Sequence, residues 1–153
     1  MTPPNPFLTA AERVARGQDA GLSFQARALT GWCAQLAADL ARLALPQPWP
    51  LARRAWTVAF NAGRRTPWAL DYAQAARDLG RARPGGQPAQ PGDLLFRTGP
   101  AAGCREGHVA VLLSAGRVLE NTTANRGTPV RPGSAIRVTP LKACPKPTLA
   151  ARP

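Results

Sequence analysis

The sequence predicts an α+β fold, in which helices from the first half of the chain pack on an antiparallel sheet from the second half. Two observations lead to this prediction. Apolar residues recur at the helical period up to about residue 80, and short strand-forming runs follow the Pro- and Gly-rich segment 83–92. The 153 residues match the usual size of one domain. We expect a helical N-terminal extension over 1–30, a core over 31–141 and a flexible tail over 142–153.

Four helices are expected in the first half. Thr9 and Glu12 have the spacing of a capping box, which predicts a helix that begins at Thr9 and ends near Arg16. A second helix is predicted to begin near Cys33, because apolar residues then recur every three or four positions, at Leu36, Ala37, Leu40, Ala41 and Ala44. Three prolines between positions 46 and 50 end this helix.

The other two helices are marked by their end signals. One is predicted over Leu51–Asn61, with Gly63 after its last turn. The other is predicted to have Thr66 as its N-cap and Pro67 as its first residue, and to run to about Leu79.

Strands are expected after residue 92. Four runs have strand character: Asp93–Arg97, His108–Leu113, Arg117–Asn121 and Ala135–Thr139. A tight turn over 114–116 joins the second and third runs into a hairpin. Beyond Lys142 the chain contains several prolines, and we expect it to fray.

The chain carries a formal charge of +12, from 20 basic and 8 acidic residues. The basic residues are scattered, so compositional drift is one interpretation and attraction to a polyanion such as an anionic cell wall is another. No helix-turn-helix, zinc-finger spacing or RNP-like aromatic motif is present, which argues against a nucleic-acid partner. The sequence shows neither a membrane-spanning apolar run nor a classical signal peptide, so we expect a cytoplasmic location or a non-classical or phage-type export route.

A cysteine and a histidine are the candidates for chemistry. His108 is the only histidine, so any reaction that needs an imidazole near neutral pH must use it. Cys33 is expected at a helix N-terminus, where free N–H groups and the helix dipole favour the thiolate, the nucleophile of acyl transfer. A cysteine on a helix N-terminus that faces a histidine on a strand is the arrangement of cysteine proteases. Taken singly, each residue also fits a structural role.

A third polar group is needed to hold the imidazole in the correct tautomer. Glu120 and Asn121 lie on the strand that follows His108 in the predicted hairpin. Successive side chains of a strand point to opposite faces, so only one of the two can face the ring. A polar strand end without a functional role is the alternative for both.

Four blocks of the chain carry a family resemblance: Gly31–Leu36 around Cys33, Pro91–Phe96, Gly107–Leu113 and Gly116–Asn121. Together they are similar to the NlpC/P60 superfamily of cysteine peptidases, including its CHAP relatives. That superfamily typically has a cysteine at a helix start, a Pro-Gly-Asp strand and a Gly-His-Val strand. A polar residue usually follows twelve positions after the histidine, and this position is Glu120 here.

The resemblance implies a papain-like core in which Cys33 attacks a peptide carbonyl, His108 acts as base and Glu120 orients His108, with Asn121 as the substitute. It implies that the substrates are stem peptides of bacterial peptidoglycan or related amides, without a cofactor or metal. The Trp-Cys-Ala-Gln sequence is closer to CHAP members, which place their glutamate further from the histidine, so the branch stays open. Gln25, eight residues before Cys33, is a further candidate for the oxyanion hole.

Two other functions compete. Cys104 and His108 have a Cys-x3-His spacing, and with Cys33 and Cys144 they would make a Cys₃His set suited to structural zinc. The second competing function is that of a non-catalytic basic binding module. A Cys104–Cys144 disulfide would leave Cys33 free, and the sequence does not decide whether that bond forms.

Overall fold

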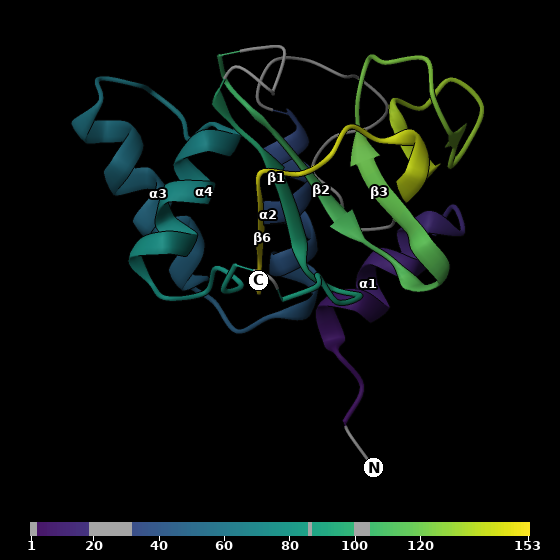
Figure 1. Ribbon diagram of the computed structural model, residues 1–153, viewed down its shortest axis with the longest axis horizontal. Helices are drawn as coiled ribbons and strands as arrows, with labels where there is room; N and C mark the ends of the chain where they lie inside the picture. Colours follow the sequence, from purple (N-terminus) through teal and green to yellow (C-terminus); the bar gives the residue numbers. More distant parts are fainter. Residues whose placement is uncertain (1–2, 19–31, 86, 100–104) are drawn as a thin grey trace.

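The computed structural model describes residues 3–18, 32–85, 87–99 and 105–153. Helices precede strands along the chain, and the predicted α+β class is confirmed (Figure 1). The helices of the described part are Pro6–Ala15 (α1), Trp32–Ala44 (α2), Pro50–Asn61 (α3) and Ala69–Asp78 (α4). The strands are Leu94–Arg97 (β1), His108–Leu112 (β2), Arg117–Asn121 (β3), Thr128–Pro129 (β4), Ile136–Pro140 (β5) and Leu149–Ala151 (β6).

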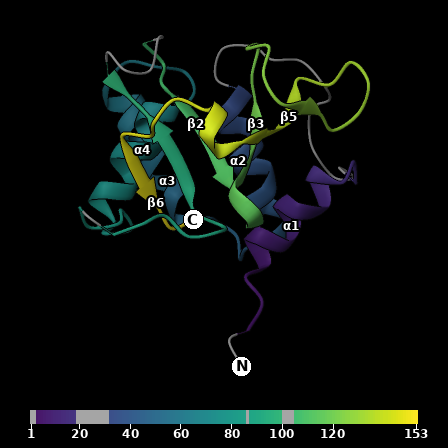
Figure 2. The same cartoon turned by 45° about the vertical axis from the view of Figure 1, so that its right-hand side comes forward.

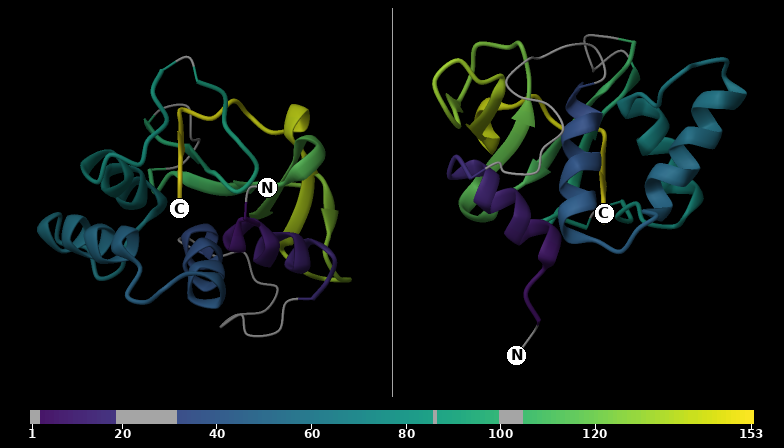
Figure 3. Two further views of the ribbon diagram at one scale, coloured as in Figure 1. Left: turned by 90° about the horizontal axis from the view of Figure 1, so that it is seen from below. Right: turned by 180° about the vertical axis from the view of Figure 1, so that it is seen from behind.

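The strands form one antiparallel sheet in the order β4-β5-β3-β2-β1-β6. The helices cover one face of it: α2 lies along β2 and β3 with α1 beside it, and α3 and α4 pair on the side of β1 and β6 (Figure 3). The main core fills the space between, where alternate strand residues point toward the helices, among them Leu94, Phe96, Val109, Val111, Leu119 and Ile136.

The other face of the sheet is covered by loops and the short 3-10 helix Leu141–Ala143 rather than by α-helices. Its strand residues form a smaller apolar cluster, made of Leu95, Ala110, Leu112 and Val118. Ala89, Leu141, Cys144 and Ala150 pack against this cluster from the flanking segments. Figure 2 shows the segment between β5 and β6 running across this face.

α1 begins three residues earlier than predicted. Asn5 is its N-cap, and the side-chain oxygen accepts two first-turn backbone N–H groups at 3.0 and 3.1 Å, with Pro6 as the first helical residue. The expected capping box is wrong, because Thr9 lies inside the helix. Glu12 instead forms an ion pair with Arg117 of β3, at 3.0 Å.

α4 begins later than predicted, at Ala69, so Thr66 and Pro67 lie before the helix. Trp68 is the N-cap, and its backbone N–H donates to Asp71 Oδ2 at 2.8 Å. The carboxylate three residues into the helix therefore sets the start. The predictions for α2, α3 and the β2–β3 hairpin are confirmed to within one or two residues.

The C-terminal segment 142–153 completes the sheet instead of fraying as predicted. β6 pairs with β1, with Ala151 opposite Leu94, and Ala151 is fully buried. Three residues are too few for a periodic signal, so the pairing depends on the free edge of β1. Among the described residues, no helix has the length and apolar character that crossing a membrane requires.

Candidate active site

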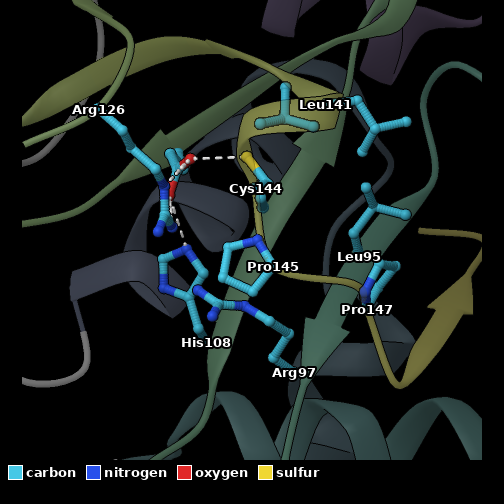
Figure 4. A pocket seen from close by; sticks show the side chains of 11 residues that line it. Leu95, Arg97, His108, Arg126, Leu141, Cys144, Pro145 and Pro147 are labelled. Atoms are coloured by element: carbon cyan, nitrogen blue, oxygen red, sulfur yellow. Dashed lines mark hydrogen bonds and ion pairs between the residues drawn. The ribbon is translucent and has the colours of Figure 1, made fainter. Parts of the chain in front are cut away.

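β2 and β3 bring two of the predicted residues together. His108 is the first residue of β2, and Glu120 is fully buried on β3. His108 Nε2 lies 3.1 Å from Glu120 Oε1 (Figure 4). A neutral imidazole that donates from Nε2 keeps Nδ1 as its acceptor, so Glu120 fixes the tautomer.

Gly107 allows the chain to enter β2 at this point. Its φ is +75°, in the left-handed region that favours glycine. A Cβ atom here would lie 3.0 Å from the backbone oxygen of Arg97 and 3.3 Å from the backbone nitrogen of Leu70. Glycine is therefore required at the position before His108, because any side chain there would displace the start of β2.

Cys33 lies in the first turn of α2 and is half-buried. Burial of the imidazole works against its charged form, but a hydrogen bond with Cys33, a second with Glu120 and the charges of both groups raise the pKa of His108 above 6.5. Because Nε2 is bound to Glu120, Nδ1 is the ring nitrogen left for the hydrogen bond with Cys33. The three residues thus form a continuous chain of contacts.

Donors from three residues converge on the Glu120 carboxylate. Arg126 binds it twice, with Nη2 2.7 Å from Oε1 and Nε 3.2 Å from Oε2, and His108 shares Oε1. The Cys144 thiol donates to Oε2 at 3.4 Å. Burial acts to raise the pKa of Glu120, but the hydrogen bonds and charges of His108 and Arg126 hold it well below its usual range. Glu120 is therefore an anion throughout the neutral range.

Arg126 and Cys144 are the members that sequence reasoning missed. Arg126 lies six residues after Glu120, beyond the end of β3, and Cys144 follows β5. Burial and the charge of Glu120 raise the pKa of Cys144 to about 11, so this thiol stays neutral and acts as a donor. The one signal that could have predicted Arg126 is electrostatic, because a buried carboxylate such as Glu120 requires a cationic partner. Cys144 is a free thiol, and Cys104, its possible disulfide partner, lies outside the described residues.

Asn121 does not join the site. Strand alternation turns it toward the helix-covered face, where it pairs in register with the core residue Ile136. It is buried, and neither its Nδ2 nor its Oδ1 atom has a hydrogen-bond partner among the described residues. The structure therefore places Glu120, and not Asn121, against His108.

Asp93 of the Pro-Gly-Asp block has a structural role. Arg83 binds its two oxygens at 2.8 Å each, and the backbone N–H of Gln90 donates to it at 2.8 Å. These bonds tie the Pro- and Gly-rich segment to the start of β1.

The zinc alternative and the oxyanion candidate depend in part on residues outside the described ones. Gln25 and Cys104 both fall there. Within the described residues, no three His, Cys, Asp or Glu side chains are grouped so that they could hold a metal ion.

A small cavity lies beside His108 on the face away from the helices (Figure 4). Its walls are mainly apolar, from Leu95, Leu141, Pro145 and Pro147, with Arg97 at one side. The imidazole therefore borders this small cavity on the side of the sheet that faces away from the helix-packed core.

Comparisons of the chain with protein-family models, with curated proteins and with solved structures found no match. What the site can do follows from its residues. A thiol at a helix N-terminus, an imidazole bonded to it and an ionised carboxylate behind the imidazole have the components of nucleophilic acyl transfer.

Proposed function

We propose that the chain is a cysteine peptidase or amidase that hydrolyses peptide bonds of bacterial cell-wall peptidoglycan. The observation that carries this proposal is the line of contacts from Cys33 through His108 to Glu120. A papain-like core of the NlpC/P60 type is part of the same proposal. It is supported by the packing of α2, which carries Cys33, on the sheet that carries His108.

The first half-reaction forms an acyl-enzyme. The Cys33 proton passes to His108 Nδ1, and the sulfur attacks the carbonyl carbon of the scissile bond. The oxyanion forms near the N-terminus of α2, where backbone N–H groups without helical partners can donate to it. When the tetrahedral intermediate collapses, the C–N bond breaks and the His108 imidazolium protonates the leaving amine.

The second half-reaction restores the enzyme. Water gives a proton to His108 and attacks the thioester carbon, after which the C–S bond breaks, His108 returns the proton to the Cys33 sulfur and the acid product leaves. Glu120 stays ionised throughout, holds the ring by Nε2 and stabilises the imidazolium. Arg126 and Cys144 hold Glu120 in place and contact no reacting atom in this scheme.

The substrate class is supported by the sequence resemblance and by charge. A formal charge of +12 favours residence at an anionic polymer such as a bacterial wall.

Digestion of purified peptidoglycan by the wild type and by Cys33→Ala tests the proposal, with products identified by mass spectrometry. We expect new amine and carboxylate ends in the stem peptides or cross-bridges with the wild type only. Cys144→Ala is the matched cysteine variant, and we expect it to retain far more activity than Cys33→Ala because its thiol only donates to Glu120. Equal release by wild type and Cys33→Ala would refute the mechanism.

A further inference from the structure

The outward face of α3 exposes two aromatic side chains one helical turn apart. Trp56 is 51% exposed and Phe60 is 79% exposed. Residues four positions apart share a helix face, so the two rings lie together. The opposite face of α3 buries Leu51, Ala55 and Ala59, and α4 is the helix packed against α3. The aromatic pair is thus not needed to hold the helix in place.

Arginines flank the aromatic pair. The stretch 50–65 has four arginines and no acidic residue. Two of the arginines are neutralised: Arg54 pairs with Asp78 at 2.8 Å, and Arg64 pairs with Asp71. The other two, Arg53 and Arg65, are exposed and form no ion pair with any described residue.

Helical geometry places Arg53 on the same side as Trp56 and Phe60, since the three positions are separated by three and four residues. Arg65 follows just beyond the end of α3. We call the surface made of Arg53, Trp56, Phe60 and Arg65 the α3 face. It joins a large apolar area to uncompensated positive charge.

We propose that the α3 face binds peripherally to the surface of an anionic lipid bilayer. That surface supplies both chemistries at once, with headgroup phosphates for the guanidinium groups and an apolar layer within reach of the rings. Tryptophan suits the interface because its ring is apolar and its N–H is polar. A charged polysaccharide would satisfy the arginines but would give Phe60 no apolar environment, which favours lipid as the partner.

The position of α3 fits a docking element. It lies at the outer edge of the molecule on the side of β1 and β6, whereas β3 and β5 lie across the sheet (Figure 1). A helix of 12 residues is about 18 Å long and can lie flat in the interface. The strand that carries Glu120 therefore lies away from the α3 face when that face is in contact with lipid (Figure 1).

Co-sedimentation of the full chain with vesicles tests the inference without any need for enzymatic activity. The vesicles are pure phosphatidylcholine or a mixture with phosphatidylglycerol, at low and physiological salt. We expect binding to the anionic vesicles only. The double variant W56S/F60S should lower the partition coefficient by roughly tenfold or more, since each loses a large apolar group from the interface. The variant R53Q/R65Q should lower it by a similar factor and weaken its salt dependence.

Leu43→Ser is the matched control, because Leu43 is also exposed but belongs to α2. We expect it to bind like the wild type. Circular dichroism confirms that each variant is folded, as expected for changes at exposed positions. The inference is overturned if the wild type does not bind anionic vesicles, or if W56S/F60S binds them as well as the wild type does. It is also overturned if a single-stranded oligonucleotide fully displaces the protein from lipid and the binding of that oligonucleotide depends on Trp56 and Phe60 alone.

Discussion

Two neighbouring residues of β3 meet opposite environments on the two faces of the sheet. Glu120, on the loop-covered face, accepts hydrogen bonds from His108, Arg126 and Cys144. Asn121, on the helix-covered face, is just as deeply buried and has no partner among the described residues. A buried polar group without partners lowers the stability of the fold, whereas a buried carboxylate that accepts several hydrogen bonds stays ionised. Burial therefore does not mark the functional residue here, and the set of partners does.

Loss of the imidazole, which lies on the same face of the sheet as Glu120, should have the largest effect on activity. His108→Ala removes the only histidine in the chain, and with it the only imidazole that could take the Cys33 proton. We expect kcat/KM for release of stem-peptide amines to fall by about 10³-fold or more. Wild-type-like far-UV circular dichroism must accompany the loss. A variant that keeps more than a tenth of the activity would contradict the assignment of the base.

Glu120→Gln should have the second-largest effect on activity. The amide keeps the shape but loses the charge, and it leaves Arg126 without its buried anion. We expect kcat/KM to fall by about 10- to 100-fold and the free energy of unfolding to fall by about 3 kcal/mol. Urea denaturation and steady-state kinetics measure the two effects. Retention of both values would mean that Glu120 is an ordinary polar strand residue.

Arg126→Gln tests whether the support behind Glu120 matters. This variant removes two hydrogen bonds from the carboxylate while His108 keeps its own. We expect roughly a tenfold loss of kcat, because Glu120 becomes less well positioned, and a basic shift in the imidazole titration, because a nearby cation is gone. NMR of the single imidazole gives the titration. A loss of activity with an unmoved titration would indicate a structural role alone.

The free energy of unfolding should also depend on pH, because Glu120 and His108 titrate differently in the folded and unfolded states. The pKa of Glu120 is lowered, so its contribution is present above the unfolded value of 4.5 and declines as the pH falls below it. The pKa of His108 is raised, so its contribution is present below 6.5 and is lost as the pH rises through the folded value. The unfolding free-energy difference between wild type and Glu120→Gln should therefore shrink below pH 4.5. A difference that stays constant down to pH 3 would contradict this linkage.

Asn121→Leu should have the smallest effect. An apolar side chain of similar size removes from the main core two polar atoms that have no hydrogen-bond partner among the described residues. We expect activity within about twofold of wild type and an unfolding free energy that is unchanged or raised by about 1 kcal/mol. Kinetics and urea denaturation again provide the measurement, and a large loss of activity would place Asn121 in the site after all.

The same contrast explains what could be predicted from the sequence. Local signals located α2, α3 and the β2–β3 hairpin, and the spacing of twelve residues identified Glu120 as the partner of His108. Strand alternation required a choice between Glu120 and Asn121 but could not make it, because the choice depends on the register in which β2 and β3 pair.

The missed features depend on long-range contacts. β6 is too short for a periodic pattern and exists because β1 offers a free edge. Cys144 reaches Glu120 from 24 residues away, and only the path of the segment between β5 and β6 brings it there. Local sequence carries no signal for either contact.

Alkylation of the cysteines with iodoacetamide, followed residue by residue by peptide mass mapping, tests the central claim most directly. If Cys33 is an activated nucleophile paired with His108, it should react at pH 7 at least tenfold faster than Cys144, whose thiol is held neutral. His108→Ala should remove that advantage. Equal rates for Cys33 and Cys144 in the wild type, or a Cys33 rate that is unaffected by His108→Ala, would contradict the account.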